Sequence, residues 1–174
     1  MTTSRLAVNV DCLTDTHRIS CRLSVGSNGL ITTLNDPLHS LLDADDLYYS
    51  RLQQPAKIAS HFETGALNKN TLALVVVARR EDLGPQAIAR LGYTRVEPVP
   101  VKVATPQFEI TGAVEVFKQF DPSELLLGGT ARFLPLYSAC AIPAQYPDTS
   151  YAGAVILVNR QMVTLIARQP RGKA

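Results

Sequence analysis

The stretch Arg18-Ile-Ser-Cys-Arg-Leu-Ser-Val25 decides the fold class, because its apolar side chains alternate with polar ones. Alternation with a period of two is typical of a half-buried β-strand. The same pattern recurs in Glu109-Ile-Thr-Gly-Ala-Val-Glu-Val116 and begins before the first stretch, at Leu6, Val8 and Val10. The sequence therefore predicts a mainly β protein with short helices.

Turn residues and apolar runs predict the elements around these strands. Gly26-Ser-Asn-Gly29 predicts a hairpin turn, with a returning strand over residues 30–34. Leucines near helical spacing predict a short helix over 37–52, with Asp36 as its N-cap. The nearly continuous apolar run at 72–78 predicts a strand buried on both faces.

The order of elements in the first half recurs in the second, which indicates an internal duplication. The aligned stretches are 18–25 with 109–116, Asp36-Pro37 with Asp121-Pro122, Arg51-Leu52 with Arg132-Phe133, Asn70 with Asn159, and Ala78-Arg79 with Ala167-Arg168. The last two matches share an offset of 89 residues, from 70 to 159 and from 78 to 167.

This alignment predicts three parts of the chain: a first β repeat at 1–83, a linker helix and turn at 84–95, and a second β repeat at 96–174 with a basic C-terminal tail. Ile88 and Leu91 share a helical face in the linker, and Gly92 suits its C-cap. Within the repeats, seven apolar residues are expected to be largely buried: Val75, Val77, Val114, Val116, Ile156, Leu165 and Ile166.

The second half resembles the Sm-like barrel, in which a first strand containing glycine is answered by two C-terminal strands joined at an arginine-bearing turn. Gly112 would be that glycine, and Leu157-Val-Asn-Arg-Gln-Met162 that turn. Arg132-Phe-Leu-Pro-Leu136 with Val155-Ile-Leu-Val-Asn-Arg160 is also similar to uncharacterised bacterial Sm-like domains. The resemblance implies two related small β-barrel (Sm-like) units in tandem.

RNA-binding Sm proteins use an Asp and Asn pair in the first motif and Arg-Gly in the second. Here Gln161 follows Arg160, and no convincing Asp/Asn pair follows Gly112. The resemblance therefore carries over only Arg160, which the tight turn is expected to project outward.

Composition and cysteine usage suit a globular cytoplasmic protein. Apolar residues make up 46% of the chain and charged residues 18%, and we find no signal peptide and no apolar span approaching the ~20 residues of a membrane helix. Cys12, Cys21 and Cys140 are odd in number and differ in context, which favours reduced thiols over a disulfide framework.

Motifs that carry chemistry are scarce. His17, His39 and His61 show no paired spacing, and Cys12, His17 and Cys21 lack a fourth zinc ligand at a familiar spacing. The sequence predicts no catalytic, cofactor-binding or metal site. Its one locally basic stretch is a candidate contact for nucleic acid or a partner and contains Arg160, Arg168, Arg171 and Lys173. The pairs Tyr48-Tyr49 and Phe117/Phe120 are expected in the core.

Three functional hypotheses remain. The leading one is a non-enzymatic protein–protein interaction or scaffold module, because duplicated small barrels offer grooves and strand edges to a partner, which is unidentified and could be a second copy. The second is a nucleic-acid-binding (RNA) adaptor that uses the four cations on one continuous face. The third is a small-molecule sensor or an enzyme with a site assembled between the repeats.

Overall fold

The fold is mainly β, as the alternating pattern predicts. The computed structural model describes residues 6–85 and 95–170. Its first half contains β1 (Leu6–Leu13), β2 (His17–Val25), α1 (Leu30–Asn35), β3 (Leu41–Arg51), β4 (Gln54–Asn68), the 3-10 helix η1 (Lys69–Thr71), β5 (Leu74–Val77) and the 3-10 helix η2 (Arg80–Leu83). Its second half contains β6 (Glu97–Ala104), β7 (Phe108–Val116), α3 (Pro122–Leu127), β8 (Phe133–Pro143), β9 (Tyr151–Asn159), the 3-10 helix η3 (Arg160–Met162) and β10 (Leu165–Arg168).

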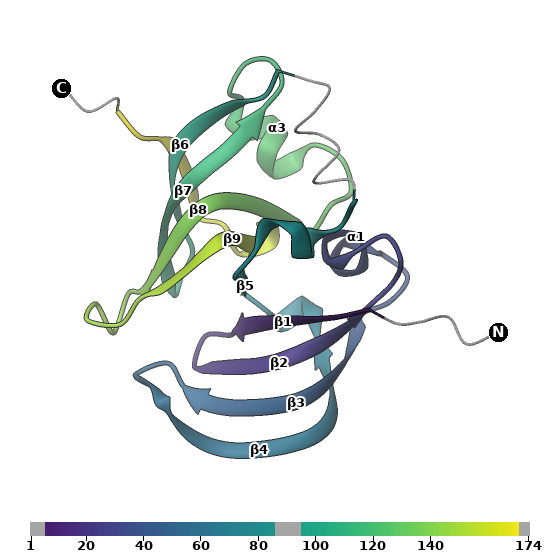
Figure 1. Ribbon diagram of the computed structural model, residues 1–174. Helices are drawn as coiled ribbons and strands as arrows, with labels where there is room; N and C mark the ends of the chain where they lie inside the picture. The colour runs from purple at the N-terminus through teal and green to yellow at the C-terminus, as the bar shows by residue number, and fades with distance from the viewer. Residues whose placement is uncertain (1–5, 86–94, 171–174) are drawn as a thin grey trace.

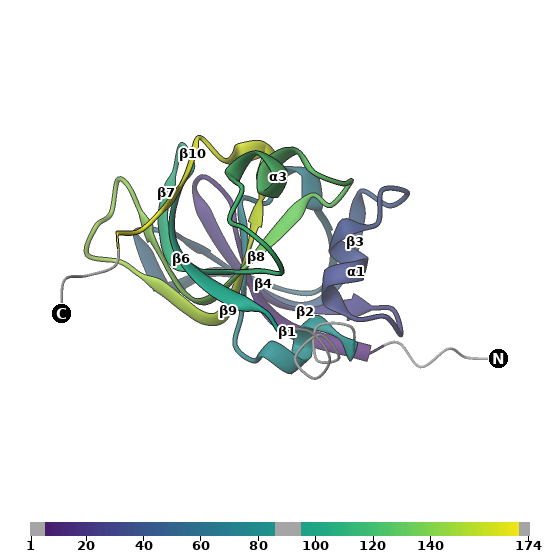
Figure 2. The same cartoon turned by 90° about the horizontal axis from the view of Figure 1, so that it is seen from above.

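The ten strands within residues 6–85 and 95–170 belong to one antiparallel sheet with the order β10-β6-β7-β8-β9-β5-β1-β2-β3-β4. The first half forms the lower part of the molecule in Figure 1, and the second half forms the upper part. Seen from above, α1 lies on the opposite side of the molecule from β7 (Figure 2). The strands thus form one open sheet that does not close on itself, and the division into two small β-barrel (Sm-like) units stays a prediction.

The halves share one element order, in which two strands, a short helix, two strands, a 3-10 helix and a last strand follow each other. The first residues of β1 and β6 are Leu6 and Glu97, which lie 91 positions apart (from 6 to 97), and β2 and β7 begin at the same separation, at His17 and Phe108. The separation is again 91 from β5 to β10 (from 74 to 165), and it is 92 from α1 to α3 (from 30 to 122) and from β3 to β8 (from 41 to 133).

Irregular features recur at the same separations. The register of β2 on β3 shifts between Ser20 and Arg22, and that of β7 on β8 shifts between Thr111 and Ala113. Two non-glycine residues have positive φ in the described chain, Asp46 in β3 (49°) and Ser138 in β8 (47°), which lie 92 positions apart (from 46 to 138). The recurrence therefore extends to bulges, which are specific features of a strand pair.

The core lies on both faces of the sheet as two clusters of buried residues. Because successive side chains of a strand point to opposite faces, each central strand contributes to both. Val75 and Val77 of β5 belong to the first cluster, and Leu74 and Val76 belong to the second. The 72–78 run is therefore a strand buried on both faces, as predicted, and its four β5 residues are all buried.

The sequence mispredicts the segment between β2 and β4. Residues 30–34 form helix α1 instead of a returning strand, because Leu30 and Leu34 lie on one helical face and are both fully buried. Gly29 enters the helix with φ 89°, and a methyl group there would overlap the backbone of Gly84. Tertiary packing therefore overrides the strand preference of Ile31.

Most of the predicted helix 37–52 is strand β3. Leu42 and Ala44 are buried and alternate with exposed neighbours, and the bulge that contains Asp46 then places Leu47 on the same buried face. The bulge hides the period of two and leaves a spacing that looks helical. Asp36 follows α1 as its C-cap instead of preceding a helix, so it does not match Asp121, which is the N-cap of α3.

Six of the seven residues expected in the core are buried, but Leu165 is 51% exposed. Tyr48 and Phe117 are also exposed, against the expectation of core packing. Strand β6 contains two prolines, Pro98 and Pro100, which lie beyond the residues that pair with β10, where a proline has one neighbouring strand. Most of the linker helix and turn predicted at 84–95 falls on residues 86–94, which lie outside the described residues. None of the described helices is long and apolar enough to cross a membrane.

Val77→Ala and Ile156→Ala each remove side-chain volume from one of the two clusters. We expect each to lower the free energy of unfolding by about 2–4 kcal/mol, because the surrounding strands cannot collapse into the cavity. Leu6→Ala, at a position that is 58% exposed, should change it by less than about 0.5 kcal/mol. Urea unfolding measures all three, and equal effects at the three positions would contradict the two-cluster core.

Candidate functional site: two open strand edges

The two ends of the sheet are the candidate interaction sites. Among the described strands, β4 pairs only with β3, and β10 pairs only with β6. β4 is 15 residues long and almost wholly exposed, and it lies at the bottom of the sheet in Figure 1. An open edge presents unpaired backbone N–H and C=O groups, which makes it a template for another strand.

Charged side chains lie on only part of the open edge of β4. Lys57 and Glu63 carry this charge in its first two thirds, where Tyr48 of β3 stacks on the ring of His61 with ring centroids 4.4 Å apart. The following residues, Thr64-Gly-Ala-Leu67, carry no charge. Since charged side chains on an edge discourage pairing, the segment 64–67 is the part of β4 best suited to accept a strand.

The junction between β5 and β9 shows how such an edge is filled within the chain. Leu74 opposes Val158, and Val77 opposes Val155. At the end of the junction, Asn159 donates its backbone N–H to Ala73 O (2.9 Å) and its side-chain amide to Leu72 O (2.9 Å). Asn159 is fully buried, so this asparagine fastens the last residue of β9 to the segment that enters β5.

Asn68 occupies the position in β4 that Asn159 has in β9. Each residue ends its strand, and each accepts a hydrogen bond from the second residue of the following 3-10 helix through its side-chain oxygen. They lie 91 positions apart (from 68 to 159), so the alignment of Asn70 with Asn159 is shifted by two residues. Asn68 differs in one respect, because it is exposed where Asn159 is buried.

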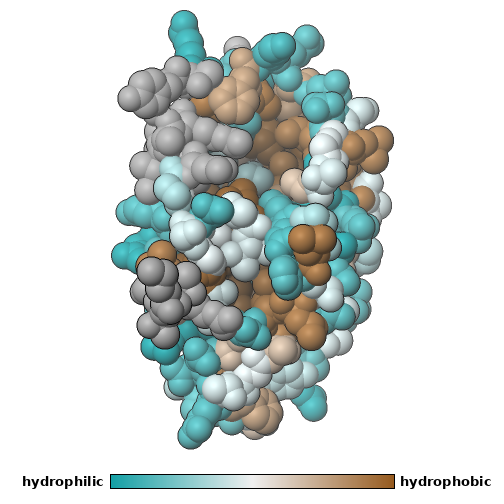
Figure 3. All heavy atoms as spheres, turned by 90° about the vertical axis from the view of Figure 1, so that its right-hand side faces the viewer, coloured by the Kyte–Doolittle hydropathy of each residue, from teal (hydrophilic) through white to brown (hydrophobic). Residues whose placement is uncertain are grey.

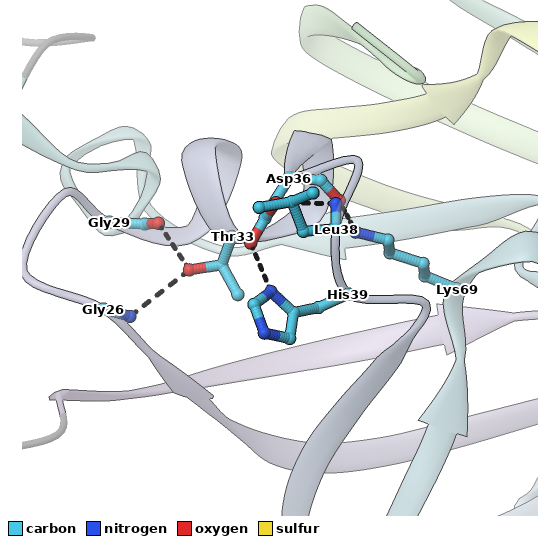
Figure 4. Close-up of polar contacts among 7 residues, drawn as sticks. All are labelled: Gly26, Gly29, Thr33, Asp36, Leu38, His39 and Lys69. Atoms are coloured by element: carbon cyan, nitrogen blue, oxygen red, sulfur yellow. Dashed lines mark hydrogen bonds and ion pairs between the residues drawn. The ribbon is translucent and has the colours of Figure 1, made fainter.

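A network of polar contacts fixes the loop after α1 next to η1 (Figure 4). Asp36 accepts a hydrogen bond from Leu38 N (2.9 Å), and its other carboxylate oxygen contacts His39 Nδ1 (2.6 Å). These two contacts hold the pKa of Asp36 below its ordinary value. The buried Lys69 donates to Asp36 O, and burial lowers the pKa of Lys69. The network therefore stabilises the loop.

Arg160 does in the second half what Lys69 does in the first, 91 positions earlier. Its guanidinium donates to Gly128 O (2.7 Å) and Leu125 O (3.2 Å) at the end of α3. Gly128 is the C-cap of α3, as Asp36 is the C-cap of α1. The expectation that Arg160 projects outward is therefore wrong: its side chain turns inward, because the carbonyl groups at the end of α3 lack helical partners.

A groove of about 1030 Å³ lies between the halves, lined by α1, the loop after it and the start of β8. Its wall includes Ile31, Phe133 and Tyr137. The face that carries α1 shows apolar side chains gathered in hollows between hydrophilic ones (Figure 3). Within the described residues, no three His, Cys, Asp or Glu side chains gather as metal ligands would.

The remaining candidates are scattered. Arg168 is exposed on the edge strand β10, on a different element from the carbonyl-bound Arg160. Arg171 and Lys173 lie outside the described residues. Cys12 and Cys21 are buried on neighbouring strands, where a contact between their thiols raises the pKa of Cys12.

Asn68, Lys69 and the open edge of β4 were not predicted from the sequence. Asn68 and Lys69 could have been recognised from a repeated dipeptide of asparagine and a cation. Asn68-Lys69 and Asn159-Arg160 both follow an apolar residue. The edge has no such signal, since strand order follows from tertiary pairing.

Comparison with known proteins assigns no family to this arrangement: no protein-family model, no curated protein and no solved structure matches the chain.

Arg160→Ala leaves the carbonyl groups of Leu125 and Gly128 without their donor. We expect it to lower the free energy of unfolding by about 1–3 kcal/mol. Arg160→Lys should lose less, because Lys69 performs the equivalent task in the first half. Arg168→Ala should leave stability unchanged, since this side chain is exposed on the edge. Urea unfolding at low protein concentration measures the three, and an Arg160→Ala protein as stable as the wild type would contradict the anchoring role.

Proposed function

We propose that this chain is an interaction and scaffold module made of two tandem Sm-like units, and that its partner is another copy of the chain joined edge to edge. The tandem arrangement is supported by the recurrence of three features at separations of 91 and 92 residues. These are the helices and strands, the bulges, and the cations Lys69 and Arg160 that begin η1 and η3. In each unit the last strand in sequence pairs with the first. The order across the sheet is therefore β5-β1-β2-β3-β4 in the first unit and β10-β6-β7-β8-β9 in the second. The units therefore meet through the fourth strand of one and the last strand of the other, as β9 meets β5.

The same pairing is available between copies. β4 is the fourth strand of the first unit and β10 is the last strand of the second, and no described strand pairs with the outer edge of either. Applying the 91-residue separation to the β5–β9 register gives the expected register between copies. The opposed pairs are Leu165 with Leu67, Ile166 with Ala66, Ala167 with Gly65, and Arg168 with Thr64.

Two observations on the edges support this register. It brings β10 onto the uncharged part of β4, residues 64–67, and avoids the charged part before it. It also covers Leu165, which is 51% exposed, although Leu74 at the equivalent place in β5 is fully buried. An exposed leucine on an open edge is an aggregation liability unless a specific strand covers it.

Asn68 completes the proposed junction. In the internal junction Asn159 bonds the backbone of Leu72 and Ala73. Asn68 would bond Val163 and Thr164 of the second copy in the same way, since these lie 91 residues after Leu72 and Ala73. Strand addition of this kind gains its affinity from main-chain hydrogen bonds.

The observation that carries the proposal is the pair of complementary open edges, because each is the equivalent of a strand that is already paired inside the chain. The RNA-adaptor hypothesis stays a prediction, and the carbonyl contacts of Arg160 remove the one cation that the family resemblance assigns to it.

The wild-type chain is expected to sediment as species heavier than its 18.9 kDa monomer at micromolar concentration. Thr64→Arg would face Arg168 of the next copy, and like charges on opposed strands should weaken association about three- to fivefold. Adding Arg168→Glu to Thr64→Arg should restore it. Sedimentation velocity measures the three proteins, and a monomeric wild type would overturn the proposal.

Cysteine cross-linking tests the proposed register between β10 of one copy and β4 of the next. Gly65→Cys with Ala167→Cys, in a Cys140→Ser background, should give cross-linked dimers with a short bismaleimide. Ile58→Cys with Ala167→Cys, seven positions away along β4, should not. Equal yields from both variants would mean that the copies associate in another register.

A further inference from the structure

The junction between the halves includes a contact from helix to strand as well as the paired strands. At the last residue of α1, Asn35 accepts a hydrogen bond from Phe133 N (2.7 Å) and donates one to Phe133 O (3.5 Å). Phe133 is the first residue of β8 and is 1% exposed. The end of α1 in the first unit thus contacts β8, the third strand of the second unit.

Helix α3 is held in the second unit as α1 is held in the first. Both helices have six residues. Their C-cap carbonyl groups, of Asp36 and Gly128, each accept a hydrogen bond from the cation that begins the following 3-10 helix, Lys69 and Arg160. Because the anchors are equivalent, the last residue of α3 faces outward from its unit as Asn35 does from the first.

That last residue is Leu127, which is 82% exposed. The residue equivalent to Phe133 is Leu41, the first residue of β3, which is 60% exposed. Both are 92 residues from their counterparts (from 35 to 127, and from 41 to 133). Two apolar side chains are therefore exposed at the two positions that correspond to a partly buried contact inside the chain.

We infer that Leu127 of one copy docks on Leu41 of a second copy, so that α3 reproduces between chains the contact that α1 makes with β8. This inference rests on the proposed edge-to-edge association, because the copy that adds its β10 to β4 is also the copy whose α3 lies next to β3. The internal contact is held by hydrogen bonds, whereas the contact between copies is apolar. Burial of both leucines away from water stabilises it.

A charge exchange tests the contact on the full chain, with sedimentation velocity as the measurement. Leu127→Lys and Leu41→Lys should each weaken self-association about tenfold, because association would bury the new charge against the leucine of the other copy. Leu127→Lys combined with Leu41→Glu should recover most of the loss. Leu127→Lys combined with Leu6→Glu, a matched exposed leucine outside the contact, should recover none.

The outcomes separate the inference from the proposal on which it rests. If the Gly65→Cys/Ala167→Cys protein cross-links and Leu127→Lys leaves the dissociation constant unchanged, the helix contact is wrong and the strand contact stands. If the wild-type chain is monomeric, both are wrong. All variants must unfold at the wild-type temperature when dilute, because Leu127 and Leu41 are exposed in the single chain; a lower temperature would show that they support the fold instead.

Discussion

The pairing of β5 with β9 is the constraint on which the rest of the structure depends. It spans four residue pairs, yet it joins two halves that otherwise have separate strands. The four residues of β5 point alternately to the two faces of the sheet, so this short strand completes both apolar clusters. Neither cluster can be dismantled without disturbing β5, and for this reason the two halves behave as parts of one sheet.

Polar contacts around this junction fix the angle between the halves. Arg80, just after β5, forms a two-pronged ion pair with Glu115 of β7 at 2.6 and 2.8 Å and stacks over the ring of Tyr137. Both side chains of the ion pair are mostly buried, and planar guanidinium–carboxylate pairs of this kind are directional. Tyr151 adds a hydrogen bond from its hydroxyl to Leu52 O. The segment leaving β5 is therefore tied to the second half immediately.

The sequence predicts the strands whose alternation is uninterrupted and fails where a local irregularity or a distant contact decides the outcome. Residues 18–25 and 109–116 are strands as expected, because nothing breaks their period of two. β3 is missed because the bulge at Asp46 shifts its pattern, and α1 is missed because only tertiary packing buries Leu30. For the site, the turn at Asn159-Arg160 is located correctly, but the direction of Arg160 depends on carbonyl groups more than 30 residues away in sequence, at Leu125 and Gly128.

The unequal lengths of the two outer strands give the sheet a polarity. β4 has 15 residues and β10 has four. One end of the sheet therefore offers a long edge and the other a short strand, and no twofold axis relates the two ends. Contacts between unlike ends are heterologous: they close into a ring when the rotation from one subunit to the next divides a full turn, and otherwise they grow as a filament. The twist at a single strand pair would then decide whether growth stops.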